Sequence, residues 1–267
     1  MVIKRLALCI FVTVSLFVTS PTQAGVFDAW SFNGSATTVD SGNVLRLTSP
    51  GGFQAGSAWA PEKVSLSNDF SIAFSFKIHG GSGADGYTLT FHNNANGNGA
   101  LGNAGGFLGY QGIDKSVTFV YDTFDNGFMT DLTSGHNTAI ARGGDLVDPF
   151  GGLDVSRPVD VNGGNLRDTV LYSWVDYSAA GSQLDMYLAD SPVKPADSIH
   201  NMSFLPGVFG SSNLFVGFTA GTGGLTDNHD ILSFSITPVP LPGALLLFGA
   251  GLTGLAAFGR LRGRIKA

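Results

Sequence analysis

Apolar and polar residues alternate in short runs along most of this chain. In FSIAFSFKI, residues 70–78, Phe and Ile occupy every second position, with Ser, Ala and Lys between them. A period of two is typical of a β-strand with one buried face. Comparable runs, bounded by Gly, Asn, Asp or Ser, occur at residues 87–93, 116–124, 169–178, 183–190, 213–220 and 230–237. Each run predicts a strand.

The segments between these runs favour an all-β fold. Before residue 238 no segment has a sustained helical period. Of the acidic residues, 19 are Asp and one, Glu62, is Glu, whereas Gly, Thr, Ser and Phe are abundant. This composition disfavours helices and suits strands joined by turns. We therefore predict that residues 25–237 form one antiparallel β-sandwich, with function on its glycine-rich loops.

The first 24 residues have the pattern of a secretory signal peptide. Lys4 and Arg5 precede an apolar run, and small residues then lead to a cleavage position after Ala24. The single cysteine, Cys9, lies inside this segment. The mature domain is thus expected to be exported and to be stabilised by its core without a disulfide.

Residues 238–267 differ from the domain in composition. Residues 241–258 carry no charge and are long enough to cross a thin membrane. Four cations follow, namely Arg260, Arg262, Arg264 and Lys266. A buried core helix is the alternative, but a basic end after an uncharged run favours a transmembrane segment with its end in the cytoplasm. We expect a precursor anchored in the inner membrane.

This C-terminal segment resembles the PEP-CTERM sorting signal of Gram-negative bacteria that make exopolysaccharide. Val239-Pro240-Leu241-Pro242 stands where the commonest form of the signal has Pro-Glu-Pro. The resemblance implies that an exosortase removes the segment. It also implies that the mature protein reaches the cell surface or the extracellular matrix.

The charge of the mature domain excludes some partners. Residues 25–237 carry 20 acidic and 8 basic residues, a net charge of −12. Such a charge disfavours nucleic acid and anionic lipid.

Residues 119–136, FVYDTFDNGFMTDLTSGH, gather oxygen ligands in a chain with few charges. They include Asp122, Asn126 and Asp131, followed by His136. An acidic hairpin whose aspartates cap turns would explain this composition, because Asp and Asn favour turns for local reasons. An EF-hand is excluded, because counting from Asp122 places Phe124 at the third ligand position.

The spacing instead resembles the metal loop of legume-type (L-type) lectins, in which a strand reading D-T-F-x-N is followed by Asp and His. Further motifs of that family occur in the same order. They are Ala84-Asp85-Gly86, Gly105-Gly106-Phe107-Leu108-Gly109, Trp174-Val175-Asp176-Tyr177 and Val216-Gly217-Phe218-Thr219-Ala220 with His229-Asp230-Ile231-Leu232-Ser233-Phe234-Ser235. Together they span about residues 28–237. The resemblance implies a concanavalin-like antiparallel β-sandwich of the jelly-roll type.

The resemblance implies a calcium ion in this loop. The carboxylates of Asp122 and Asp131, the amide oxygen of Asn126 and the backbone carbonyl of Phe124 would hold it. Calcium takes six to eight oxygen ligands, which suits this set. His136 is a further metal ligand in the family, but here a relic of that role or an ordinary loop histidine is slightly favoured over a ligand.

A second, transition metal such as Mn²⁺ is expected to bind poorly. Plant members of the family place a Glu two residues before the first Asp of the loop, and this chain has Val120 there. A site that lacks one carboxylate is weak for a transition ion.

The resemblance also implies a sugar site. Asp85, after a cis peptide bond to Ala84, would accept hydrogen bonds from sugar hydroxyls, and Asn126 would donate one. Gly106, which lacks a Cβ, would let its backbone approach the ring. The remaining implied contacts are Phe128, Gly224 and Leu225.

These features predict a calcium-dependent lectin without enzymatic activity, with glycans or exopolysaccharide as partners. The first alternative is a matrix or scaffold protein that keeps the fold without binding sugar. A glycoside hydrolase of this architecture is a weaker alternative, because it uses a pair of Glu residues and Glu62 is the single Glu of the chain.

Overall fold

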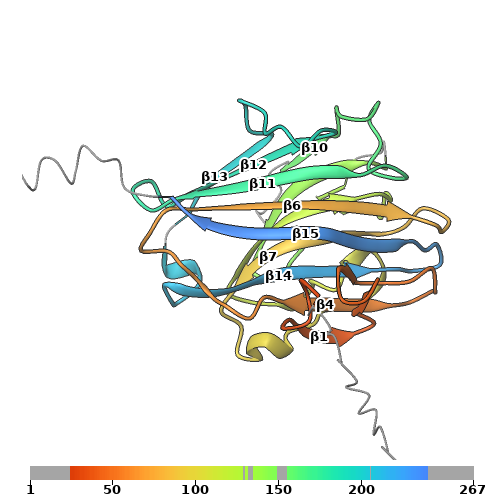
Figure 1. Cartoon of the computed structure of the whole chain (residues 1–267), viewed down its shortest axis with the longest axis horizontal. Coiled ribbons are helices and arrows are strands. Elements are labelled where there is room, and N and C mark those ends of the chain that lie inside the picture. Colours follow the sequence, from red (N-terminus) through yellow and green to blue (C-terminus); the bar gives the residue numbers. More distant parts are fainter. Residues whose placement is uncertain (1–24, 129, 132–134, 149–154, 205, 240–267) are drawn as a thin grey trace, which may run out of the picture.

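Two antiparallel β-sheets pack face to face in the computed structural model of this chain (Figure 1). The structure describes residues 25–128, 130–131, 135–148, 155–204 and 206–239. The chain is thus an all-β sandwich, as predicted. The 3₁₀ turns η1 (Gly97–Gly99), η2 (Gly105–Phe107) and η3 (Pro206–Val208) are the helical elements among the described residues.

The first sheet has eight strands, and seven of them follow the order β1-β4-β14-β7-β8-β9-β10, while β5 pairs with β14. Their bounds are β1 (Ser31–Gly34), β4 (Ala55–Trp59), β5 (Val64–Ser65), β7 (Gly86–His92), β8 (Ser116–Asp122), β9 (Asn137–Arg142), β10 (Ser156–Pro158) and β14 (Asn213–Gly221).

The second sheet has seven strands in the order β13-β12-β11-β6-β15-β3-β2. Their bounds are β2 (Thr37–Val39), β3 (Val44–Arg46), β6 (Phe70–His79), β11 (Leu171–Ser178), β12 (Gln183–Ala189), β13 (His200–Ser203) and β15 (Asn228–Pro238).

Every strand predicted from alternation is present, with ends that differ by at most two residues. The other strands escaped prediction because most are short and lie near sheet edges, where side chains need not alternate. Strand β9 is an exception of another kind: five of its six residues are buried, so it carries no alternation at all.

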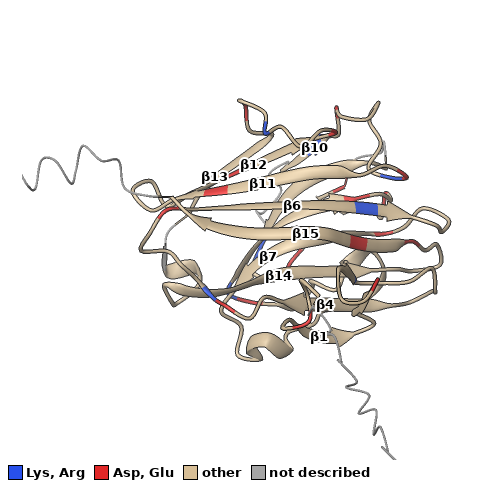
Figure 2. Cartoon of the chain, in the orientation of Figure 1, with Lys and Arg blue, Asp and Glu red and all other residues tan. Residues whose placement is uncertain are grey.

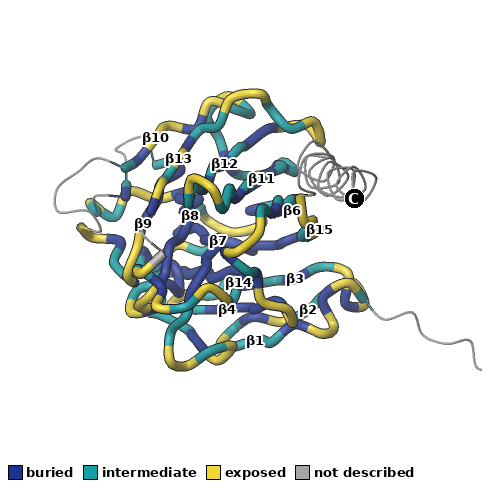
Figure 3. Tube along the Cα trace, turned by 90° about the vertical axis from the view of Figure 1, so that its left-hand side faces the viewer, coloured by how far each residue is buried: buried dark blue, intermediate teal, exposed yellow. Residues whose placement is uncertain are grey.

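The main core lies between the sheets, where many positions are buried (Figure 3). It is rich in aromatic residues. Tyr87 and Tyr121 stack with ring centroids 4.6 Å apart. Phe74 of the opposite sheet packs edge-on against Tyr121 at 5.9 Å. Such contacts hold the two sheets in a fixed relation.

A second apolar cluster covers the outer face of the eight-stranded sheet. Trp59, Leu108, Tyr110, Val120 and Leu146 belong to it. Loops supply part of this cover, so all seven residues of β7 and of β8 are buried. Charged residues are sparse on the strands and occur chiefly in loops (Figure 2).

The predicted signal peptide, residues 1–24, and the predicted transmembrane segment, residues 241–258, lie outside the described residues. Across the described part of the chain, no helix has the length and apolar character needed to cross a membrane.

Candidate functional site

Three neighbouring strands of the eight-stranded sheet end at the same level. Gly86, the first residue of β7, pairs with Asp122, the last residue of β8. It also pairs with Gly221, the last residue of β14. The loops that precede β7 and follow β8 and β14 therefore meet at one end of the sandwich, the end at which β6 finishes in Figure 1.

The carboxylate of Asp85 lies where these loops meet. Its side chain is 3% exposed, and its Oδ2 has no hydrogen-bond partner among the described residues. Its Oδ1 accepts a hydrogen bond from Nδ2 of Asn126 at 3.4 Å. Burial raises the pKa of Asp85 to about 6, although the hydrogen bond from Asn126 and the nearby Gly223 backbone act in the opposite direction. The peptide bond between Ala84 and Asp85 is cis, as the resemblance implies.

Gly106 lets η2 lie directly against Asn126. A Cβ placed on Gly106 would lie 2.3 Å from Cγ of Asn126, which is too close for any real contact. A larger residue would therefore displace the Asn126 side chain. Asp85, Gly106 and Asn126 thus converge from three separate loops.

Asp122 and Asp131 come together in the loop between β8 and β9. Asp122 is 1% exposed, and its Oδ1 accepts the backbone N–H of Phe124 at 2.8 Å. Burial, and then the adjoining Asp131 carboxylate, raise the pKa of Asp122 well above its ordinary range. Oδ2 of Asp131 accepts the backbone N–H of Asn126 at 2.7 Å, which fixes the loop. A buried carboxylate beside a second carboxylate is costly unless a cation or a proton neutralises it.

These residues fit a calcium ion. Oδ2 of Asp122 is buried and lacks a partner among the described residues, so an oxygen is available for a cation. Asn126 donates from Nδ2 to the carbonyl of Phe124 at 3.1 Å, which leaves its Oδ1 for a cation. No three His, Cys, Asp or Glu side chains of the described ranges form a metal-binding group by themselves. A calcium ion here would need amide, carbonyl and water oxygens as well, as calcium sites commonly do.

A comparison with protein families matches residues 14–134 to the legume-like lectin family. The matched residues include Asp85, Gly106 and the loop from Asp122 to Asp131. Residues 14–134 of this chain are thus similar to legume-like lectins. A curated relative, an L-type lectin-domain containing receptor kinase of Arabidopsis thaliana, is 28% identical over 140 residues, which are 49% of this chain. The match covers 18% of that kinase.

Solved lectin structures share the fold. Lectin II from Ulex europaeus superposes with a TM-score of 0.62 at 19% identity, covering 80% of this chain and 94% of that one. The exoplasmic/lumenal domain of VIP36, in a form bound to Ca²⁺ and Man3GlcNAc, gives 0.59 at 22% identity, covering 80% and 85%. Basic winged bean lectin with Tn-antigen gives 0.59 at 22% identity, covering 79% and 94%. At these identities the likeness establishes a legume lectin-like sandwich.

Aromatic side chains flank the candidate sugar site. Phe128 stacks on Phe107 of η2, with ring centroids 5.3 Å apart and planes tilted by 16°. Both rings are partly exposed. Phe124 is 38% exposed, while its carbonyl faces Asn126. Phe128 is thus braced by a neighbouring ring at the edge of the site.

The loop between β14 and β15 completes this end of the domain. A Cβ on Gly223 would lie 3.2 Å from Oδ2 of Asp85, so this backbone passes close to the carboxylate. Gly224 has open space beside it, and Leu225 is 40% exposed. The implied sugar contacts Gly224 and Leu225 therefore lie on a loop that passes over Asp85.

The contacts of His136 are with residues other than Asp122 and Asp131. Its Nδ1 faces the backbone N–H of Leu166 at 3.5 Å. Burial and the positive charge of Arg167 lower its pKa, against the effect of Asp227. These neighbours belong to the segment before β11 and to the loop before β15. The role of His136 as a metal ligand stays a prediction.

Val120 occupies an apolar environment. It is fully buried in the second cluster, against which Phe128 and Val155 also pack. A carboxylate at this position would be surrounded by hydrocarbon. The surroundings of Val120 thus suit an apolar side chain. They do not suit the carboxylate that plant lectins have at this position as a ligand of the transition metal.

Sequence reasoning overlooked three residues of this region, Gly223, Asp227 and Arg167. Gly223 contacts Asp85, and Asp227 forms an ion pair with Arg167 at 2.7 Å. Asp227 precedes the His229-Asp230 motif by two positions, which was the one available hint. Nothing in the sequence around Arg167 indicates its partner.

Proposed function

We propose that this domain is a calcium-dependent lectin that binds glycans or exopolysaccharide through the loops around Asp85. The observation that carries the proposal is the convergence of Asp85, Asn126 and Gly106, in which Asp85 keeps a buried oxygen without a partner among the described residues. A buried acceptor of this kind is stabilised by a hydroxyl donor from a ligand. Glycan binding by related lectins of this fold supports the same conclusion.

Calcium would be held by Asp122 and Asp131 through carboxylates, by Asn126 through Oδ1 and by Phe124 through its carbonyl. When bound, the ion would neutralise the carboxylate pair and stabilise the loop that carries Asn126. The residues of the chain then perform the recognition: Asp85 accepts from hydroxyls, and the Phe128 ring offers an apolar face. A second transition metal is not part of this proposal, because Val120 replaces the carboxylate that it would need.

A glycan array probed with residues 25–239, with calcium and with chelator, tests this function. Binding in calcium that disappears in chelator is the expected result. Calcium-dependent stabilisation of a domain that binds no glycan would favour the alternative, a matrix scaffold on the lectin fold.

We further propose that residues 1–24 direct export and that residues 238–267 anchor the precursor until an exosortase releases it to the cell surface or matrix. The uncharged span before the basic end supports this proposal. Removal of residues 240–267 should convert a membrane-associated precursor into a released protein, measured by fractionation of the expressing cells. Membrane association that persists without this segment would contradict it.

A further inference from the structure

Two loops beside Asp85 are joined to each other by backbone hydrogen bonds. The loop between β6 and β7 and the loop between β14 and β15 meet at Thr226. The N–H groups of Ser82 and Gly83 both donate to the carbonyl of Thr226, at 2.6 and 3.1 Å. The N–H of Thr226 donates in return to Oγ of Ser82 at 3.0 Å. A change in the position of one loop therefore moves the other.

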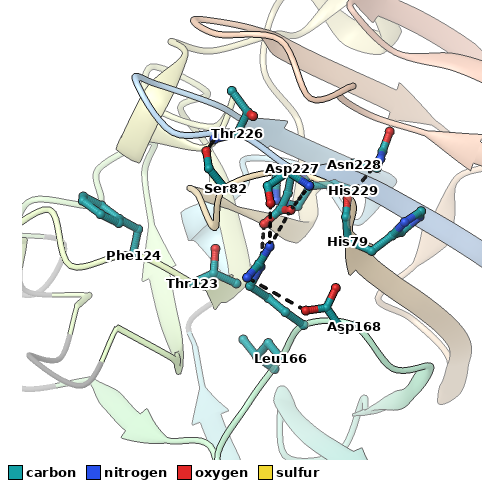
Figure 4. Close-up of polar contacts among 12 residues, drawn as sticks. His79, Ser82, Thr123, Phe124, Leu166, Asp168, Thr226, Asp227, Asn228 and His229 are labelled. Carbon is teal, nitrogen blue, oxygen red and sulfur yellow. Dashed lines mark hydrogen bonds and ion pairs between the residues drawn. The ribbon is translucent and has the colours of Figure 1, made fainter.

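Arg167, from the segment before β11, clamps this pair of loops. The loop residues Ser82, Thr226 and Asp227 lie close together in Figure 4. Nε of Arg167 donates to Oδ2 of Asp227 at 2.7 Å and its Nη2 to Oδ1 at 3.0 Å. Nη2 also donates to the carbonyl of Gly81 at 3.2 Å. Asp227 is fully buried and accepts the N–H of Gly81 at 2.9 Å through Oδ1. One guanidinium thus contacts both loops, which its rigid fork of donors allows.

Residues that Arg167 contacts lie close to Asp85, the carboxylate of the sugar site. A Cβ on Gly83, two residues before Asp85, would lie 3.5 Å from Nη1 of Arg167. On the other loop, Asp227 follows the Gly223 backbone that approaches Asp85. The backbone N–H of Asp85 itself donates to the carbonyl of Gly221 at 3.2 Å. The two loops beside Asp85 are therefore held in place by contacts that Arg167 joins.

We propose that Arg167 is a positioning residue for the sugar site: through Asp227 and Gly81 it holds the two loops that place Asp85, Gly224 and Leu225. For its sugar-binding consequence this inference rests on the proposed function. Its local structural consequence, the immobilisation of the two loops, can be measured without any ligand. A misplaced supporting group loosens a site even when every contact residue is present.

The same fold supplies a matched control. Arg46 forms an ion pair of the same kind with Asp230, at 2.8 Å from Nε and 2.7 Å from Nη2. Arg46 is 25% exposed and Asp230 is 5% exposed, against 21% and 0% for Arg167 and Asp227. The Arg46 pair joins β3 to β15, and Oδ2 of Asp230 also lies 3.0 Å from Nε2 of His79, the last residue of β6. These contacts are with strand residues and not with the loop residues that Arg167 contacts. Replacement of either arginine removes a bidentate ion pair with a buried carboxylate. Of the two arginines, Arg167 is the one that contacts the loops of the sugar site.

The experiment compares Arg167→Gln with Arg46→Gln in calcium. Hydrogen–deuterium exchange is measured on peptides that cover residues 80–86 and 221–228, and binding is measured on an array of mannose-, galactose- and N-acetylhexosamine-terminated glycans. Arg167→Lys keeps the charge without the fork, and the double variant Arg167→Gln/Asp227→Asn removes the unpaired buried charge should the single variant fail to fold.

We expect faster exchange confined to the two loops in every folded Arg167 variant, including the lysine variant, and no such change in Arg46→Gln. Glycan binding should weaken by about tenfold or more while stabilisation by calcium is retained, because the clamp acts on position and not on the calcium ligands. Unchanged exchange in both loops, or equal effects of Arg46→Gln, would overturn the inference. If the wild type binds no glycan on the array, the proposed function fails, and the exchange data alone decide whether Arg167 holds the loops.

Discussion

At the scale of single residues, the site is defined by buried oxygens that lack donors. Asp85 and Asp122 each keep one carboxylate oxygen without a hydrogen-bond partner among the described residues. The cost of such an atom is about 1–3 kcal/mol, and a donor or cation from a ligand would offset it. The two oxygens suit different ligands: that of Asp122 adjoins a second carboxylate, whereas that of Asp85 faces the loops of the sugar site.

Replacement of Asp122 by Ala should abolish stabilisation by calcium. In the wild type, calcium at a hundredfold excess over its dissociation constant should add about 2.7 kcal/mol of stability by mass action. Melting curves in calcium and in chelator measure the effect for both proteins. The matched control is Asp125→Ala, at an exposed aspartate of the same loop. Identical wild-type curves in calcium and in chelator would rule out the metal site.

Replacement of Asp85 by Ala should remove glycan binding and leave most of the calcium-dependent melting shift in place. Hydrogen bonds to a charged acceptor contribute roughly 1.5–3 kcal/mol each, so the loss of two should bring a shallow site below detection. Asp85→Asn should also fail, because an amide supplies one acceptor oxygen where the carboxylate supplies two. Array binding and melting curves of both variants test this. Retained glycan binding by both would place the sugar contact elsewhere.

At the scale of elements, the site depends on strand register. Because Gly86 pairs with both Asp122 and Gly221, the loops bearing Asp85, Asn126 and Gly223 leave the sheet at one level. A slip of one residue in β8 would turn Asp122 and Val120 to the opposite face. The packing of Val120 into the apolar cluster and the alternate residues of β8 into the main core oppose such a slip.

Replacement of Gly106 by Ala should weaken glycan binding strongly, because the added Cβ would lie 2.3 Å from Cγ of Asn126. Asn126 must then move, and with it both its contact with Asp85 and its oxygen for calcium. Array binding and the calcium-dependent melting shift should therefore decline together, unlike in Asp85→Ala. Gly112→Ala tests a glycine that has open space for a Cβ but a positive φ, and it reports the cost of backbone strain alone. Unchanged binding by Gly106→Ala would contradict the close approach.

At the scale of the whole molecule, buried histidines make the stability of the sandwich depend on pH. His200 of β13 is 5% exposed, and its Nε2 lies 3.0 Å from Oγ1 of Thr138 on β9, so this contact joins the two sheets. Burial lowers the pKa of His200 to about 4, and the nearby Arg157 acts in the same direction. The folded protein therefore holds this ring neutral, while the unfolded chain binds a proton below a pH of about 6.5.

The stability contributed by neutral His200 should be fully present above pH 6.5 and should be lost as pH falls toward 4. Between pH 7.5 and pH 5 the loss for this group is on the order of 2 kcal/mol. Urea unfolding of the wild type and of His200→Gln, both in chelator, measures the difference, since other titrating groups contribute equally to both. Equal losses in the two proteins would contradict a neutral buried His200.

Local patterns in the sequence determined the fold class and the long strands. Alternation in β6 and β11 is a property of neighbouring residues, so it can be read without knowing their partners. The spacing of Asp122, Asn126 and Asp131 is equally local, and it located the carboxylate loop. The Ala84-Asp85-Gly86 motif marked the loop before β7 as a functional surface, and the resemblance added Gly224 and Leu225 in the loop after β14.

Tertiary structure alone decided how these segments meet. Partners such as Arg167 and Asp227 are 60 residues apart in the chain, and no local pattern records their pairing. His136 lies at the spacing of the family motif, yet its contacts are with Leu166 because the segment before β11 packs beside it. In the sequence, Val120 is indistinguishable from any other apolar strand residue. Its role in the outer cluster depends on loops that fold over the sheet. Contacts of this kind arise when strands far apart in sequence align, which is a property of the whole sandwich.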